Sequence, residues 1–147
     1  MFYDEISKYF EWLVFLVGAL QLLQLPATIY ASKTPELGWR DDLCRLSQLN
    51  RRIATVMAIG VVLVGTGTGI LVMIFKQEIA EGQNLAGAFS LFLAVFWAFR
   101  GGVQIGIYTR YWPQKPVLLL LCHYGLILLF STLTFSYLLI FVRGLLC

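Results

Sequence analysis

Three polar residues at four-residue steps are the strongest candidates for chemistry in this sequence: Arg100, Gln104 and Tyr108. Residues four apart share one face of a helix, and these three follow a long apolar stretch. A charged side chain in such a stretch is costly to place in a membrane and is a functional candidate by default. A guanidinium suits a carboxylate, a phosphate or a quinone carbonyl. We therefore expect Arg100 to anchor such a group, with Gln104 as a hydrogen-bonding partner and Tyr108 at the rim.

The single histidine, His123, is the next candidate. It lies roughly 9 Å into the last apolar stretch if that stretch is helical, and an imidazole can share a proton with a bound acid. We expect Arg100 to point inward, within reach of Gln104, His123 or the glutamines of the first apolar stretch, Gln21 and Gln24. The predicted ligand-binding residues are Arg100, Gln104, His123, Tyr108, Arg51 and Gln24.

Three functional hypotheses fit these residues. The first is a non-catalytic polar pocket in the inner leaflet that binds a lipid-like, anionic or quinone-like ligand. The alternative is an accessory or structural subunit of a membrane complex, whose polar residues bond to one another or to a partner. Such bonds between membrane helices average only about 0.6 kcal/mol. The second alternative is haem binding through His123, which would need a dimer or a methionine ligand such as Met57.

No complete catalytic motif is present, and we predict no catalytic residue. Ser131, Ser136 and Cys122 lack a credible base and a group to orient it. The three cysteines, Cys44, Cys122 and Cys147, have no metal-like spacing, so no metal site is predicted. No motif requires a cofactor; quinone and haem are the two that the candidate site could take.

The composition indicates an integral membrane protein. Of 147 residues, 59% are hydrophobic and 13% are charged, and the mean hydropathy is +0.79. A soluble domain has about a quarter of its residues charged. After four membrane crossings, no room remains for a soluble catalytic domain. The net charge of +3 is interpreted as a topology signal and not as a sign of nucleic-acid binding.

Four apolar segments are long enough to cross a membrane as helices, because about 20 residues suffice and backbone groups in lipid must pair internally. Two of the connections, 76–84 and 110–116, are short, which favours antiparallel neighbours. We predict an all-α integral membrane protein, a single transmembrane domain over 1–147 that forms an antiparallel four-helix bundle. The predicted spans are about 10–30, 53–75, 85–108 and 117–142.

The long connection between the first two spans has a helical pattern of its own. Leu43, Leu46, Leu49 and Ile53 recur at three- and four-residue steps, the spacing of one helical face. We predict an amphipathic helix over about 39–50, lying at the membrane interface and running into the second span.

The distribution of lysine and arginine predicts the orientation. Seven of these cations fall in the first and third connections, against three on the other side. Positive charge favours the cytoplasm. We therefore expect a multi-pass protein of the cytoplasmic membrane, with both termini outside and the loop 31–52 inside. Cys44 would then be cytoplasmic and Cys147 external. The acidic start of the chain favours a first span that is kept as an anchor.

Small residues suggest where helices approach closely. Gly65 and Gly69 form one GxxxG pair, and Gly102 and Gly106 form another. This spacing lets helix backbones approach, so each pair is either a homodimer face or a packing site within the bundle. Membrane lipid, a membrane-protein partner and a second copy of the chain are the expected partners; nucleic acid is not.

Three strings carry a resemblance to a known group. They are Trp39-Arg40-Asp41-Asp42-Leu43, Leu49-Asn50-Arg51-Arg52-Ile53, and Phe96-Trp97-Ala98-Phe99-Arg100 followed by Gln104, Tyr108 and Trp112. Together they resemble a group of small, uncharacterised four-helix bacterial membrane proteins. The resemblance implies a bacterial cytoplasmic membrane, and it implies no activity, because none is assigned to the group.

Overall fold

A computed structural model describes residues 2–82, 84–113 and 115–146, and within these ranges the regular structure is entirely helical. Four stretches are long and apolar enough to cross a membrane, and they cover the four predicted spans to within one residue. They are Ser7–Lys33, Gln48–Ile74, Asn84–Tyr111 and Val117–Leu146.

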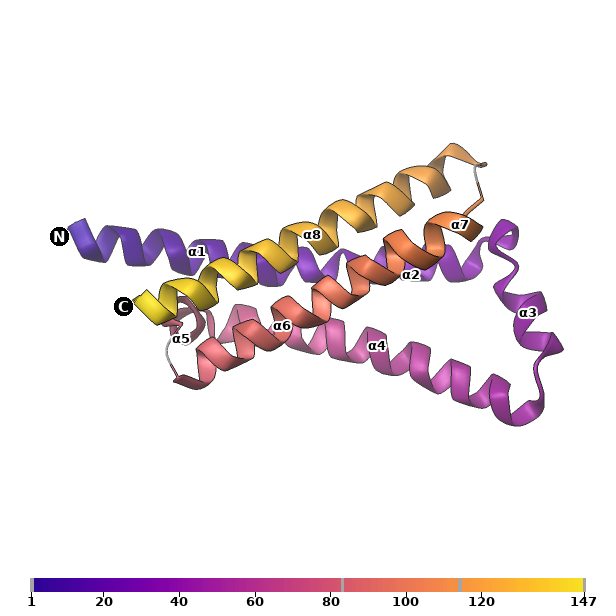
Figure 1. Cartoon of the computed structure of the whole chain (residues 1–147), viewed down its shortest axis with the longest axis horizontal. Coiled ribbons are helices and arrows are strands. Elements are labelled where there is room, and N and C mark those ends of the chain that lie inside the picture. The colour runs from indigo at the N-terminus through magenta and orange to yellow at the C-terminus, as the bar shows by residue number, and fades with distance from the viewer. Residues whose placement is uncertain (1, 83, 114, 147) are drawn as a thin grey trace.

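The long helices run in alternating directions along the molecule (Figure 1). Helix α3 lies at one end, called here the α3 end, and α5 lies at the other, the α5 end, where α1 begins and α8 ends. The elements are α1 (Phe2–Leu22), α2 (Gln24–Lys33), a 3₁₀ turn (Pro35–Leu37), α3 (Trp39–Arg45), α4 (Gln48–Ile74), α5 (Lys76–Glu81), α6 (Asn84–Val103), a π-helical turn (Gln104–Tyr108), α7 (Thr109–Tyr111) and α8 (Val117–Leu146).

The first apolar stretch is broken at Leu23, between α1 and α2. The cause is Pro26, which has no N–H to donate to the carbonyl of Leu22, four residues earlier. The chain tightens there, and the Leu23 N–H donates to the Leu20 carbonyl at 3.1 Å. As a result, Gln24 is the first residue of a redirected helix.

The α5 end is closely packed. Gly82 adopts a left-handed conformation with φ +67° at the end of α5, and α8 passes it at Gly144. A Cβ atom added to Gly144 would collide with the Gly82 carbonyl oxygen. Arg143 on α8 donates from Nη1 to the Ala80 carbonyl at 3.2 Å. These contacts therefore hold α5 and α8 together at this end.

The apolar core lies in the half of the molecule toward the α5 end, and it includes one polar cluster. Gln21 donates from Nε2 to the Tyr137 hydroxyl, and Thr68 donates to Gln21 Oε1 at 3.2 Å. Gln21 was expected near Arg100, and its bonding partners correct that expectation, since they tie α1 to α8 and α4. The buried apolar residues are Val14, Val17, Val72, Ile79, Ala80, Leu93, Ala94, Trp97, Phe130, Leu133, Tyr137 and Ile140.

Helix α4 packs mainly against α1 and diverges from α6 and α8 toward the α3 end (Figure 1). Gly65 and Gly69 mark its close contact with α1 and α2. A Cβ atom on Gly69 would lie 3.0 Å from the Gly18 carbonyl oxygen. This glycine pair therefore packs within the chain. Gly102 and Gly106 have no described atom within 4 Å of an added Cβ, so dimerisation through that pair stays a prediction.

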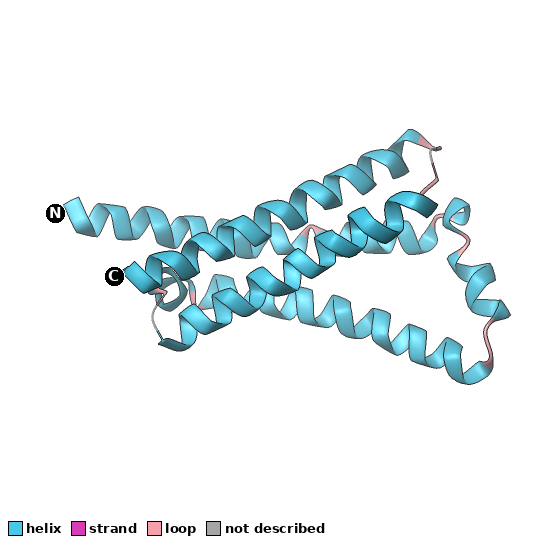
Figure 2. Cartoon of the chain, viewed as in Figure 1, coloured by secondary structure: helices cyan, strands magenta, loops and turns pink. Residues whose placement is uncertain are grey.

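The predicted helix over 39–50 is wrong in its extent, because α3 ends at Arg45 (Figure 2). Leu46 is extended, and Ser47 caps α4 by accepting a hydrogen bond from the Asn50 N–H at 3.3 Å. A serine at this position satisfies a backbone donor of the new helix, which favours a separate start. Arg51 stabilises the break, since its Nε and Nη2 donate to the Leu43 and Cys44 carbonyls at 2.7 and 2.8 Å.

Candidate functional site

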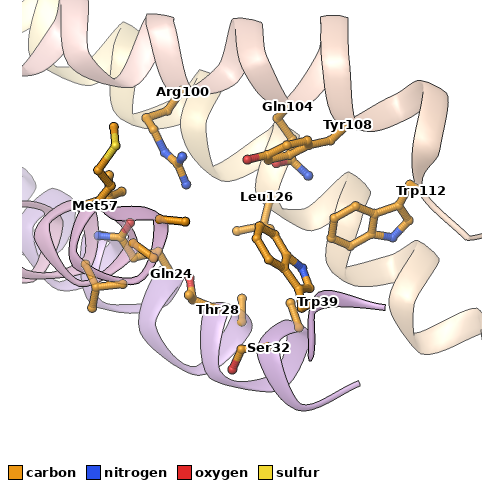
Figure 3. Close-up of a pocket in the computed structure, with 16 residues that line it drawn as sticks. Gln24, Thr28, Ser32, Trp39, Met57, Arg100, Gln104, Tyr108, Trp112 and Leu126 are labelled. Carbon is orange, nitrogen blue, oxygen red and sulfur yellow. The ribbon is translucent and has the colours of Figure 1, made fainter. Parts of the chain in front are cut away.

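A cavity of about 350 Å³ lies between α2, α4, the π-helical turn and α8, toward the α3 end (Figure 3). Four of the six predicted site residues line it. The lining residues are Gln24, Ala27, Thr28, Ala31, Ser32, Trp39, Ala54, Met57, Ala58, Val61, Val62, Arg100, Gln104, Tyr108, Trp112 and Leu126. His123 lies behind Gln104, outside this lining. Arg51 holds the end of α3, so the structure does not bring it to the cavity.

The π-helical turn keeps four residues on the cavity side. In an α-helix, each four-residue step overshoots a full turn by roughly 40°, so Trp112 would lie about 120° around the axis from Arg100. A π-helical turn contains more residues per turn and reverses part of this drift. Arg100, Gln104, Tyr108 and Trp112 therefore all line the cavity. The four-residue spacing predicted the shared face, but not the turn that preserves it as far as Trp112.

The charge in the cavity comes from Arg100. Among the described residues that line it, Arg100 alone is ionised at neutral pH. Its guanidinium projects inward from α6, toward the side where Gln24 and Met57 lie (Figure 3). It lies 5.4 Å from the ring centroid of Phe130, and its buried Nε has no hydrogen-bond partner among the described residues. The expected inward direction is therefore observed, whereas a direct bond to Gln104, His123 or the glutamines is not.

Gln24 lines the cavity, but its amide nitrogen packs against α4. The side chain is 3% exposed, and Nε2 has no hydrogen-bond partner among the described residues. Gly65 on α4 makes room for it, because a Cβ atom there would collide with Nε2. Buried polar groups are nearly always hydrogen-bonded. Gln24 Nε2 and Arg100 Nε are therefore two unsatisfied donors on residues that line one cavity.

His123 closes a ring of hydrogen bonds behind the cavity wall. Gln104 Nε2 lies 2.8 Å from Nδ1, and the Thr109 hydroxyl lies 3.2 Å from Nε2. Thr109 also donates to the Gln104 carbonyl at 3.1 Å. A histidine that carries its proton on Nε2 satisfies all three bonds. The Trp112 ring lies beside the imidazole, with 5.0 Å between the ring centroids, and His123 is 2% exposed. Through these contacts His123 positions the π-helical turn.

Thr109 and Trp39 are the residues that the sequence analysis missed. Thr109 gave no signal, because its role depends on the π-helical turn and on His123 from another helix. Trp39 lines this cavity and two neighbouring ones, of which one lies between α3 and the ends of α2 and α4, and the other between α3, α4 and the π-helical turn. Its place at the start of an amphipathic segment was the available signal.

The donor chemistry does not resemble a metal or haem site. No group of three or more His, Cys, Asp or Glu side chains that could hold a metal occurs among the described residues. A haem iron at His123 would have to displace a hydrogen bond from one of the two ring nitrogens. These bonds give no support to the haem alternative.

No family model, curated protein or solved structure with which the chain was compared matches it. The resemblance to small bacterial membrane proteins, and the bacterial membrane that it implies, stay expectations from the sequence.

Proposed function

We propose that this chain is a multi-pass membrane protein that binds an amphiphilic ligand, without catalysis, in the cavity at Arg100. One observation supports this function above others. Arg100 lines the cavity, and its buried Nε has no hydrogen-bond partner among the described residues. Its side chain is half-buried, and a charge held partly away from water without a partner is destabilising. A ligand oxygen that accepts hydrogen bonds from the guanidinium would offset this cost.

The apolar part of the lining supports a ligand with a hydrocarbon portion. Small and aliphatic side chains of α2 and α4 face the polar residues of α6 across the cavity. Met57 lines it while 66% of its surface remains exposed, so this wall is shared between the cavity and the outside of the molecule. Methionine is flexible and adapts to irregular ligands. A chain entering from the lipid would pass this side.

The proposed placement is an antiparallel four-helix bundle with its α3 end in the cytoplasm. The cations at that end are all exposed, as expected for residues that determine topology. Arg100 is eleven residues before Tyr111, the last residue of its apolar stretch, or roughly 16 Å along the helix. In this orientation the cavity lies in the inner leaflet. The seven cations are Lys33, Arg40, Arg45, Arg51, Arg52, Arg110 and Lys115.

Mass spectrometry of the purified protein tests this function. The full chain, extracted in a mild non-ionic detergent, should carry a bound small amphiphile. Arg100→Leu should lose it, because its anchor is gone. Arg110→Leu is the matched control, since Arg110 is an exposed cation on the same apolar stretch and does not line the cavity. The proposal fails if the wild type carries no amphiphile and binds none added back, or if Arg100→Leu retains it fully.

The second candidate is an accessory subunit whose partner helix completes the site. The observation that favours it is the open face of α6 and the π-helical turn at Gly102 and Gly106, where an added Cβ meets no described atom. Close approach of another helix suits such a glycine pair. A co-purifying membrane protein that is lost with Gly106→Leu, while any bound amphiphile stays, would favour this candidate.

A further inference from the structure

The unpartnered polar atoms at the cavity are hydrogen-bond donors. Gln24 Nε2 and Arg100 Nε are both buried without partners among the described residues. Arginine has donors and no acceptor. Gln104 adds little donor capacity, because its Nε2 already points to His123 at 2.8 Å. A ligand that pairs with the cation of this site must supply acceptors.

The charge of the site narrows the class of acceptor. The described lining residues other than Arg100 are uncharged at neutral pH, so the cavity carries one positive charge. A neutral carbonyl would accept the hydrogen bonds and leave that charge uncompensated. A monoanion would neutralise it, and an oxyacid can engage the guanidinium through two parallel hydrogen bonds. A dianion would leave a net negative charge in a low-dielectric site.

The size of the cavity suits a small head group. Its volume of about 350 Å³ is near the lower end of the range for small-ligand pockets. It accommodates a head and the beginning of one chain. The remaining length of a chain would leave past Met57, Val61 and Val62, which form the apolar wall on α4.

We propose that the ligand is a single-chain amphiphile with a monoanionic oxyacid head. Its oxygens accept from the Arg100 guanidinium and, once the Gln24 amide turns away from Gly65, from Gln24 Nε2 as well. Its chain lies against Met57, Val61 and Val62. This assignment rests on the function proposed above. Two sources share the chemistry: a fatty-acid carboxylate and the phosphodiester of a single-chain phospholipid. They differ in the size of the head, which a binding comparison resolves.

The test compares four probes on the full chain in non-ionic detergent at alkaline pH. They are hexadecanoate, lysophosphatidylglycerol, hexadecanol and decylubiquinone, and the readouts are native mass spectrometry and the ligand-induced shift in Tm. At least one of the two anions should bind, and hexadecanol should bind about tenfold more weakly or worse, because it lacks the charge-assisted bonds. The tighter of the two anions identifies the source of the head.

Variants connect the binding to the named side chains. Arg100→Lys keeps the charge and loses the two-pronged geometry, so the Kd for the anion should rise about tenfold while that for hexadecanol stays unchanged. Gln24→Leu should weaken binding of the anion and leave binding of hexadecanol unchanged. The variant should fold, because it removes a donor that has no partner among the described residues. Arg110→Leu should bind as the wild type does. These variants test the contact between the anionic head and the two side chains even if Arg100→Leu does not fold.

The outcomes separate the two proposals. Equal affinity for hexadecanol and both anions, or anion binding that is unaffected in Arg100→Lys and Gln24→Leu, would overturn the monoanion assignment. Binding of decylubiquinone alone, weakened by Arg100→Lys, would overturn the assignment and leave the proposed function standing. Binding of no probe, together with no co-purified amphiphile, would overturn both.

Discussion

Gln104 Nε2 lies 2.8 Å from His123 Nδ1, which connects the cavity wall on the π-helical turn to α8. The same imidazole bonds to Thr109 through its other nitrogen. One histidine thus holds both ends of the π-helical turn. This relationship assigns His123 to positioning the cavity wall, and it leaves Arg100 and Gln24 to meet the ligand.

The His123 relationship predicts a loss of stability on substitution. His123→Ala leaves the buried Gln104 Nε2 without a partner, which costs about 1–3 kcal/mol, whereas the Thr109 hydroxyl keeps its bond to the Gln104 carbonyl. The Tm in detergent should fall, and amphiphile binding should weaken without being abolished. Leu121→Ala is the control, because Leu121 lies on the same helix and is exposed. A His123→Ala variant as stable as wild type would contradict the positioning role.

Gly65 and Gly67 form a matched pair on α4. A Cβ atom on Gly65 would collide with the Gln24 amide, whereas one on Gly67 meets no described atom within 4 Å. Gly65→Ala should destabilise the protein by about 1–3 kcal/mol through overpacking and should weaken binding by displacing Gln24. Gly67→Ala should be neutral or slightly stabilising in a helix. Thermal unfolding of the two variants measures this difference, and equal Tm values would show that α4 does not contact Gln24 this closely.

Arg51 was predicted to be a ligand-binding residue, and its bonds to the Leu43 and Cys44 carbonyls predict a different role. Arg51→Leu should free the end of α3, raising hydrogen exchange and protease cleavage over residues 39–46. Binding at Arg100 should change little. Arg52→Leu removes the neighbouring exposed charge and serves as the control. Loss of amphiphile binding in Arg51→Leu, with hydrogen exchange over residues 39–46 unchanged, would show that Arg51 contributes to ligand binding.

The proposed orientation places Cys44 in the cytoplasm. Cys44 is exposed at the α3 end, whereas Cys147, predicted to be external, is not among the described residues. A better external probe is Glu81→Cys, at the exposed end of α5. In backgrounds with every other cysteine replaced by serine, an impermeant thiol reagent on intact cells should label Glu81→Cys and spare Cys44. The reverse pattern would move the cavity to the outer leaflet.

The helices and the shared face of Arg100, Gln104 and Tyr108 could be predicted, because both follow from periodicity along one segment. The predictions that were wrong concern contacts between different segments of the chain. Gln21 has the same residue type as Gln24, but the two lie on either side of the break at Leu23. Gln21 bonds to Tyr137 and Thr68, whereas Gln24 Nε2 has no partner among the described residues. α4 begins separately from α3 because Ser47 caps it, and the regular spacing of apolar residues in this segment gave no sign of that break.

The central claim is that Arg100 is kept for a ligand and not for the stability of the chain. The most direct measurement is the Tm of ligand-stripped wild type and Arg100→Leu, each with and without the anionic amphiphile that binds. Without ligand, Arg100→Leu should be at least as stable as wild type, because a half-buried charge whose Nε has no hydrogen-bond partner has been removed. With ligand, the Tm of wild type should rise and that of Arg100→Leu should not. A lower Tm for ligand-free Arg100→Leu, with an equal ligand-induced rise in both proteins, would contradict the claim.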